Sequence, residues 1–129
     1  MDDSFAQDER LYRGLHQIWI EDDNSVSSAA FKDSGGNSVD RDGGREEQAC
    51  IDRLMGALPQ IAAVGRITYE EVEECGAITK YCPVEGNEFH SEIRDSDVQV
   101  QIKSKSKSRK LANKCQVVFK KEEKAEPHD

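Results

Sequence analysis

The 129-residue sequence has few aromatic residues and no long apolar segment. Aromatic residues make up 6% of the chain and hydrophobic residues 36%, whereas 34% are charged, so we expect a small core. No apolar run reaches the roughly 18 residues of a transmembrane helix, so none is predicted. The N-terminus has neither the basic nor the apolar region of a signal peptide, so we expect a cytoplasmic protein.

The sequence also lacks the usual signatures of catalysis and cofactor binding. It contains no Gly-x-Ser-x-Gly elbow, no Gly-x-Gly-x-x-Gly loop and no Walker loop. None of its four cysteines forms a Cys-x-x-Cys pair, and free thiols are expected in a reducing compartment. A zinc site of Cys75, Cys82, His90 and Cys115 would match no common zinc module. We therefore expect neither a metal nor a cofactor.

Charge is unevenly distributed along this acidic chain, whose formal net charge is −8. Such a chain is a poor general binder of nucleic acid or anionic membranes, so we expect no membrane partner. The last quarter contains a basic segment without acids. It comprises Lys103, Lys105, Lys107, Arg109, Lys110, Lys114, Lys120 and Lys121. This segment could be a solvated face that neutralises the acidic part, a strip that contacts phosphate or RNA, or a docking surface for an acidic protein.

The pattern of apolar residues predicts one small α+β domain over residues 10–120. Predicted strands and helices do not alternate regularly, which favours a largely antiparallel sheet with two or three short helices. Residues 1–9 are expected to form a flexible acidic leader, and residues 121–129 a disordered tail.

Three segments favour a helix. Residues 45–58 carry an apolar face and end at Pro59. Residues 68–74 begin with Thr68-Tyr69-Glu70-Glu71, a capping box, and Gly76 suits the position after the helix. Residues 105–115 are the third candidate.

Several short apolar runs favour strands. The run at 98–102 alternates strictly, which is typical of a strand with one solvated face. Residues 11–20 fit either a helical stripe or extended pieces, and residues 27–31 fit a strand or a short turn. Residues 33–37 contain a strong turn signal. The other predicted strands are 38–40, 61–67, 77–83, 89–94 and 117–119.

Two arginines and two serines are the candidate ligand-binding residues. Arg13 lies between apolar residues, and Arg41 follows a glycine turn; their planar donors suit phosphate or carboxylate. Ser27 and Ser28 are small hydroxyl residues near Phe31 that could line a cleft. The structural alternatives are ion-paired arginines and serines that bond their local backbone.

Two histidines and a glutamate are the candidate catalytic residues. His90 begins a predicted strand, and Glu92 shares its sheet face because strand side chains alternate. His16 lies three residues after Arg13. A histidine titrates near neutrality and can act as a general acid or base. The alternative is a hydrogen-bonded histidine that fastens a turn.

These motifs resemble a poorly characterised family of small bacterial proteins. The family pattern contains Arg-x-x-His, Ser-Ser-x-Ala-Phe, Ser-Val-Asp and Asn-Pro-x-His-Ala-x-Ile. The resemblance covers roughly residues 11–119. This chain differs in carrying Gln17 after His16, and Glu88-Phe89 in place of a proline and a small residue. The resemblance implies a shared site without an assigned activity. The matching segments are 13–16, 27–31, 38–40 and 87–93.

A weaker resemblance links the chain to ADP-ribosyltransferase and related NAD-binding toxin folds. Those folds begin with an arginine on an early strand, followed by a serine-bearing segment. Arg13 and Ser27 or Ser28 would match these two features, and Glu92 would supply the acidic residue.

Three classes of function stay open. We favour a binding or accessory protein, such as a partner subunit in a bacterial multi-gene system of the defence type, because the chain is small and acidic and lacks a catalytic motif. The second class is an enzyme acting on a nucleotide or nucleic-acid phosphate, with Arg13 and Arg41 as phosphate ligands and His16 or His90 as acid or base. The third is a nucleic-acid-binding protein using residues 103–121, where few aromatic residues are available for base stacking.

Overall fold

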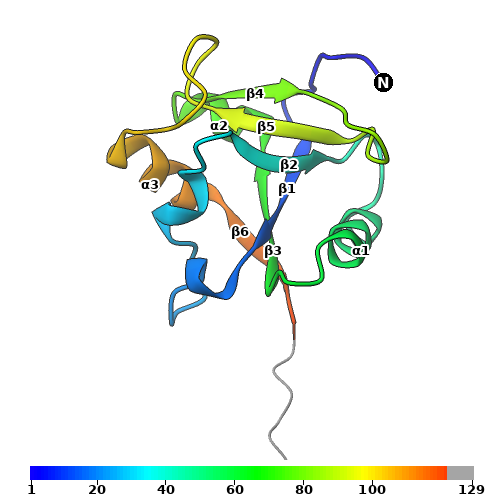
Figure 1. Ribbon diagram of the computed structural model, residues 1–129, viewed down its shortest axis with the longest axis horizontal. Coiled ribbons are helices and arrows are strands. Elements are labelled where there is room, and N and C mark those ends of the chain that lie inside the picture. The colour runs from blue at the N-terminus through cyan, green and yellow to red at the C-terminus, as the bar shows by residue number, and fades with distance from the viewer. Residues whose placement is uncertain (122–129) are drawn as a thin grey trace, which may run out of the picture.

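Six strands form one antiparallel sheet in the computed structural model, which describes residues 1–121. Their order across the sheet is β4-β5-β2-β1-β3-β6, and every neighbouring pair is antiparallel. The sheet is strongly twisted: β4 and β5 run across Figure 1, whereas β1, β3 and β6 run down it. This arrangement confirms the predicted small α+β domain. The strands are β1 (Arg10–Leu15), β2 (Asn37–Arg41), β3 (Ala63–Thr68), β4 (Ile78–Tyr81), β5 (His90–Arg94) and β6 (Gln116–Lys120).

Helices lie on both sides of the sheet. Helix α1 stands on one side, and α3 with the second 3-10 helix stands on the other (Figure 1). All three predicted helices are confirmed with nearly the same bounds. The α-helices are α1 (Glu47–Ala57), α2 (Tyr69–Glu74) and α3 (Lys105–Lys114), and the 3-10 helices are η1 (Gln17–Trp19) and η2 (Ser28–Phe31).

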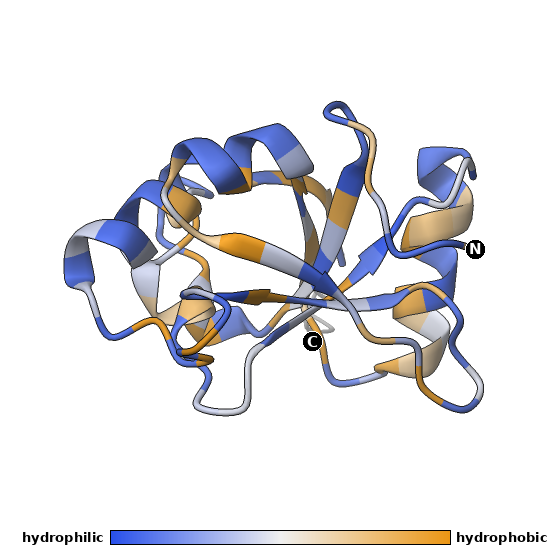
Figure 2. Ribbon diagram, turned by 90° about the horizontal axis from the view of Figure 1, so that it is seen from above, coloured by the Kyte–Doolittle hydropathy of each residue, from blue (hydrophilic) through white to orange (hydrophobic). Residues whose placement is uncertain are grey.

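Each face of the sheet buries its own apolar cluster. Hydrophobic and polar segments alternate along the strands (Figure 2), as expected for strand side chains that point to opposite faces. On β1, Leu11 and Leu15 join the larger cluster with Phe31 of η2. Tyr12, between them, joins the smaller cluster with Leu54 of α1. The central strand is therefore covered on both sides.

Short-range signals place the ends of α2 correctly. The Thr68 side chain accepts a hydrogen bond from the Glu71 amide, and the Glu71 side chain accepts one from the Thr68 amide, which is the predicted capping box. Gly76 follows the helix with φ +82°, a left-handed conformation that glycine adopts without steric cost.

The structure resolves the two ambiguous segments. Residues 11–20 are mainly the strand β1 followed by the single-turn helix η1. Residues 27–31 form the short helix η2, and the Ser27 hydroxyl caps it by accepting from the Ala29 amide at 3.2 Å.

Residues 98–102 form no strand, so the prediction for this segment is wrong. The chain turns back after β5, and the Asp95 amide donates to the Val100 carbonyl at 3.1 Å. Val98 is 96% exposed, whereas Ile102 is fully buried. No strand of the sheet pairs with this segment, so its alternating residues form a tight loop in which Ile102 is buried.

The acidic leader, residues 1–9, contacts the domain through several groups. The Phe5 ring stacks on Tyr69 with centroids 5.0 Å apart. Arg41 donates to two carbonyl oxygens of the leader and forms an ion pair with Glu9, which is only 7% exposed. The leader therefore contributes both backbone and side-chain contacts to the fold.

Apart from Lys121, the predicted tail lies outside the described residues. Within residues 1–121, the structure contains no helix long and apolar enough to cross a membrane.

Candidate functional site

The central strands β1 and β2 separate along their length. Their register pairs Leu11 with Arg41 and Tyr12 with Asp40, and the ladder ends there. On its other side, β1 continues to pair with β3 as far as Leu15. The two strands therefore open into a wedge, and the peptide groups that face it must find other partners.

Arg13 fills the apex of this wedge. Its Nε donates to the Ala30 carbonyl at 2.8 Å, and a terminal nitrogen donates to the Ser38 carbonyl at 2.7 Å. The other terminal nitrogen forms a 3.0 Å ion pair with Asp33. Burial lowers the pKa of Arg13, and the Asp33 carboxylate opposes that shift. The side chain takes over hydrogen bonds that a continued ladder would have made, and an arginine stays charged in this setting.

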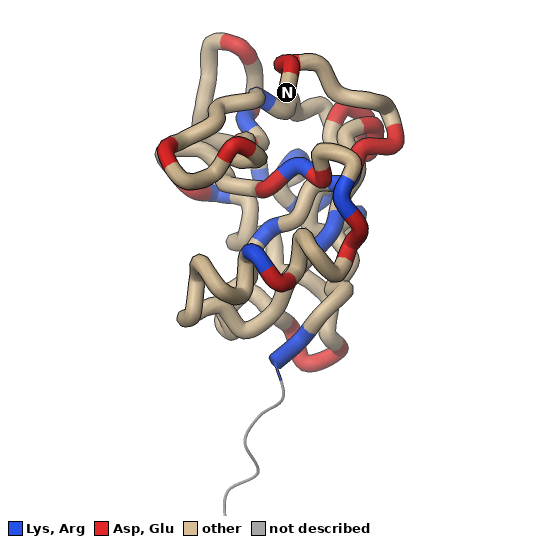
Figure 3. The backbone as a smooth tube through the Cα atoms, turned by 90° about the vertical axis from the view of Figure 1, so that its right-hand side faces the viewer, with Lys and Arg blue, Asp and Glu red and all other residues tan. Residues whose placement is uncertain are grey.

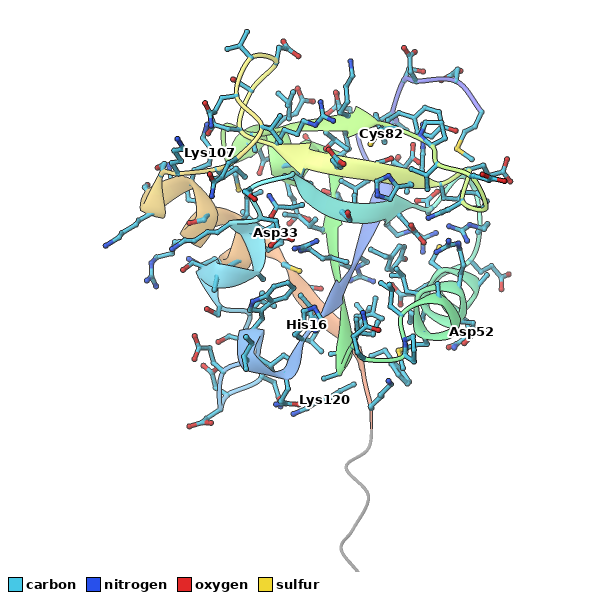
Figure 4. All side chains as sticks on the ribbon, viewed as in Figure 1. His16, Asp33, Asp52, Cys82, Lys107 and Lys120 are labelled. Carbon is cyan, nitrogen blue, oxygen red and sulfur yellow. The ribbon has the colours of Figure 1, made fainter. Side chains whose placement is uncertain are left out.

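A pocket of about 410 Å³ opens beside the wedge, a volume typical of small-molecule sites. It is bounded by β1 with the segment that follows it, by β2, by α1, and by the turn between β4 and β5. Figure 4 shows His16 near the end of β1, whereas Asp52 of α1 faces outward. The polar lining includes Arg13, His16, Ser38, Asp40, Asn87 and His90.

The wall towards α1 is largely apolar. Leu54 and Leu58 reach the pocket from the helix, and Ile61 follows it. Gly14 lines the opposite side, and a Cβ atom there would lie 3.0 Å from Ile61. A larger residue would have to push the Ile61 side chain aside, so glycine favours the close approach of the strand to the segment after α1.

Aromatic rings border the polar end of the pocket. The His16 and Trp19 rings meet edge to face with centroids 4.7 Å apart. The Arg13 guanidinium lies 5.1 Å from the Trp19 ring and 5.6 Å from the Phe31 ring, distances at which a cation is attracted to an aromatic face. The rings therefore help to hold Arg13 in place.

Asp40 ties two walls of the pocket together. It is 1% exposed and accepts hydrogen bonds from Arg53 of α1 at 2.9 Å and from the Asn87 amide group at 2.8 Å. The Asn87 side-chain oxygen in turn accepts from the Phe89 amide at 3.0 Å. The buried carboxylate thus fixes both the helix and the β4–β5 turn, and its charge is compensated by Arg53.

His90 lies at the pocket rim with both ring nitrogens in contact. Its Nδ1 is 2.9 Å from the Cys82 carbonyl oxygen, and its Nε2 is 3.2 Å from the Ser38 hydroxyl. A carbonyl oxygen only accepts, so Nδ1 carries the ring proton and Nε2 is left to accept from Ser38. The position of His90 opposite Asp40 on β2 places it in the site.

Glu92 lies two residues after His90 on the same strand, opposite Ser38. Its Oε1 accepts a hydrogen bond from the Arg94 Nε at 2.9 Å and forms an ion pair with a terminal nitrogen of Arg94 at 2.8 Å. The predicted shared face of His90 and Glu92 is present, and the Cys82 thiol lies beside them, with Sγ 3.5 Å from the His90 Nδ1. Burial raises the pKa of the Cys82 thiol, and the Glu92 charge adds to this shift.

Three predicted site residues lie outside the pocket. Ser27 caps η2, and Ser28 is the first residue of that helix. Arg41 points towards the N-terminal leader, where it pairs with Glu9 at 2.7 Å and stacks on Phe5 at 4.0 Å. Arg13 and His90 thus share one pocket, whereas the serines stay at η2 and Arg41 lies in the paired part of the β1–β2 ladder.

The zinc set weighed from the sequence is not brought together. Cys75 and Cys115 are buried in the larger core cluster. Burial raises the pKa of Cys115 to about 12. Within residues 1–121, the one group of three metal-ligating side chains is Cys82, His90 and Glu92.

The basic segment is divided between ion pairs and an exposed face. Lys107 bonds Asp95 at 2.8 Å, and Lys114 lies 4.0 Å from Glu74. The remaining basic residues on and before α3 are exposed to solvent. They are Lys103, Lys105, Arg109 and Lys110.

Some residues of the site had no place in the sequence-based prediction. Trp19 and Arg53 lie at positions that only the tertiary fold brings to Arg13 and Asp40. Cys82 carried a usable signal: a hairpin that turns at Gly86 places the residues four before and four after it opposite each other, and these are Cys82 and His90.

No family model, no curated protein and no solved structure matches this chain. The two resemblances stated from the motifs therefore stay predictions, and the site is interpreted from its own chemistry.

Proposed function

We propose that this protein binds a small organic molecule in the pocket formed by Arg13, Asp40 and His90. The observation that carries the proposal is the convergence of three separate polar motifs on one pocket with an apolar wall. A concave site with a few convergent polar groups is the usual form of a ligand site. A purely structural role for Arg13 would not require two histidines and a second arginine beside it.

The charges of the pocket narrow the class of ligand. Two arginines face three carboxylates, so the site offers no excess of positive charge. Both arginines are ion-paired already, at 3.0 Å and 2.9 Å. On the side of the molecule that carries α1, acidic and basic positions are interspersed (Figure 3). This arrangement favours a neutral or singly charged molecule over a polyphosphate. The charged residues are Arg13, Arg53, Asp33, Asp40 and Glu85.

The lining favours a ligand with an apolar body and a polar edge that carries both donors and acceptors. Its body would lie against Leu54 and Leu58, and its edge would meet the Asp40 and His90 end of the pocket. Nucleosides and nucleobases have this character, which connects the proposal to the nucleotide hypothesis without requiring phosphate binding. Arg41, the second expected phosphate ligand, lies outside the pocket.

An accessory role is supported by the exposed basic face of α3. Lys105, Arg109 and Lys110 face solvent without an ion pair among the described residues, and the chain as a whole is acidic. We propose this face as the docking surface for an acidic protein partner, with nucleic acid as the competing occupant. Binding of RNA that weakens steeply with salt concentration would favour the nucleic-acid alternative.

The ligand proposal is tested by a thermal-shift screen of nucleosides, nucleobases, nucleotides and small carboxylic acids. The pocket-blocking variant is Ala57→Phe, because Ala57 is exposed yet lines the pocket. Its matched control is Asp52→Phe on the outer side of the same helix. We expect a compound that raises the Tm of the wild type and of Asp52→Phe but not of Ala57→Phe. A shift of equal size in both variants would contradict the proposal.

A further inference from the structure

Three metal-ligating side chains meet on the face of the sheet beside the pocket. The Cys82 amide donates to the His90 carbonyl at 3.2 Å, which places these residues opposite each other at the end of the β4–β5 hairpin. Glu92 follows His90 on the same face. Figure 4 places Cys82 next to β4 and β5, near the edge of the sheet. One ligand atom from each residue lies within 4.8 Å of the other two.

The chemistry of these ligands selects among metals. A thiolate, an imidazole nitrogen and a carboxylate oxygen are the three ligand types that proteins use for zinc. Magnesium and calcium prefer sets made only of oxygen, which Cys82 and His90 exclude. Because the His90 Nδ1 donates to the Cys82 carbonyl, Nε2 is the ring nitrogen that would bind the ion, once the Ser38 hydroxyl turns away from it.

Neighbouring groups hold the three ligands in position. Both contacts of Arg94 with Glu92, a hydrogen bond and an ion pair, are made to Oε1, so Oε2 has no hydrogen-bond partner within residues 1–121. The Cys82 carbonyl holds the His90 ring through Nδ1. Metal-binding carboxylates and histidines are typically fixed by such outer contacts.

Gly36, which has no side chain, leaves space for the Glu92 carboxylate. A Cβ atom on Gly36 would lie 2.6 Å from the Glu92 Oε1, and Gly36 also has φ +100°. Any other residue at this position would displace Glu92 and strain the turn before β2.

We propose that Cys82, His90 and Glu92 bind one divalent transition-metal ion, with Zn²⁺ as the best fit. Three protein ligands leave a coordination position for water or for another molecule, as in zinc sites that act on a ligand. Because His90 also lines the pocket, the ion would lie at the pocket rim. This metal site stands independently of the proposed small-molecule ligand.

The test uses Co²⁺ as the probe, titrated into the purified, metal-free full chain under reducing conditions. A cobalt ion bound by a thiolate gives a charge-transfer absorption band in the near ultraviolet, which an oxygen- or nitrogen-only site does not. We expect this band to saturate at one ion per chain, and Zn²⁺ to abolish it. Cys82→Ser should remove the band, and Glu92→Gln and His90→Ala should weaken Co²⁺ binding at least about tenfold.

Matched variants keep the test specific. Cys75→Ala removes a thiol elsewhere, and Glu88→Gln removes an exposed carboxylate from the same hairpin. Both should bind Co²⁺ like the wild type, and circular dichroism should show every variant folded. Ala57→Phe, which fills the pocket, should keep the metal site, so loss of ligand binding and loss of metal binding are separable. Absence of the band in the folded wild type, or its persistence in Cys82→Ser, would overturn the proposal.

Discussion

Two buried arginines lie at opposite ends of the β1–β2 pair, and they differ in what surrounds them. Arg13 is 3% exposed and Arg41 is 4% exposed, and each stacks on aromatic rings and pairs with a carboxylate. Arg41 lies where the strands are paired, and its partner Glu9 is buried. Arg13 lies where the strands have separated, and the side chain of its partner Asp33 is 48% exposed.

The comparison shows that a buried cation does not by itself mark a functional site. At the Arg41 end the leader covers the guanidinium, and the buried Glu9 carboxylate neutralises its charge. At the Arg13 end the wedge leaves a pocket beside the guanidinium. What distinguishes the two ends is the early termination of one strand ladder, which leaves room for a ligand.

Removing Arg41 should have the largest effect on stability and none on the pocket. Arg41→Ala leaves the buried Glu9 carboxylate without its partner, and breaking a buried ion pair of this kind costs about 3–5 kcal/mol. Urea unfolding should report this loss. Ligand-induced thermal shifts in the folded variant should be unchanged. Loss of the ligand-induced shift in Arg41→Ala would contradict the distinction between the two ends.

Removing Arg13 should cost less stability but abolish ligand binding. Arg13→Met keeps most of the buried volume and leaves the Ala30 and Ser38 carbonyls without their donor, which we expect to cost about 2–3 kcal/mol. Its ion pair with Asp33 contributes little because that carboxylate is half exposed. Equilibrium unfolding and the thermal-shift assay measure the two effects, and normal ligand binding by Arg13→Met would contradict our interpretation of this end.

Alkaline pH should act on the Arg13 end through Cys115. Burial raises the pKa of this thiol to about 12 in the folded protein, whereas the pKa of a cysteine in an unfolded chain is about 8.5. Between these values the unfolded chain loses the proton and the folded chain keeps it. Stability should therefore fall by about 1.4 kcal/mol per pH unit in this window, and not below it.

The control for the alkaline effect is Cys115→Ala. The quantity to compare between this variant and the wild type is the slope of the unfolding free energy against pH, not its absolute value. Unfolding free energies measured from pH 8 to pH 11 should decline less steeply in the variant. Parallel slopes for the two proteins would show that Cys115 does not titrate as its burial requires.

The smallest effect is expected from the cap of η2. Ser27→Ala removes the hydroxyl that accepts from the Ala29 amide, which should cost about 0.5–1 kcal/mol. Because the Ala30 carbonyl in this helix holds Arg13, ligand affinity should weaken slightly. Ser28→Ala is the matched control with an intact cap, and isothermal titration should separate the two. A larger loss of affinity in Ser28→Ala would assign the serines a direct role.

The sequence predicts elements with local signals better than it predicts the site. The capping box at Thr68 and the helix ending at Pro59 depend on residues close in the chain, and both are found as expected. The alternation at 98–102 misleads because an isolated period-two pattern does not show whether a partner strand exists.

The difference between Arg13 and Arg41 depends on tertiary contacts that no local pattern contains. Arg13 lies between apolar residues and Arg41 follows a glycine turn, so both were reasonable candidates. Where the β1–β2 ladder ends decides their roles, because Arg41 lies in the paired part and Arg13 beyond it. The apposition of Cys82 and His90, in contrast, follows from a hairpin turn that the sequence does indicate.

The most direct test of the central claim is chemical-shift mapping of the ¹⁵N-labelled protein with a compound identified by thermal shift. We predict saturable shifts of the amide signals of Gly14, His16, Gly86, Asn87 and His90, all of which line the pocket. Signals of Gly43 and Gly44, at the Arg41 end, should not move. Shifts concentrated at Gly43 and Gly44, with the pocket signals unchanged, would contradict the assignment of the ligand site to the Arg13 end.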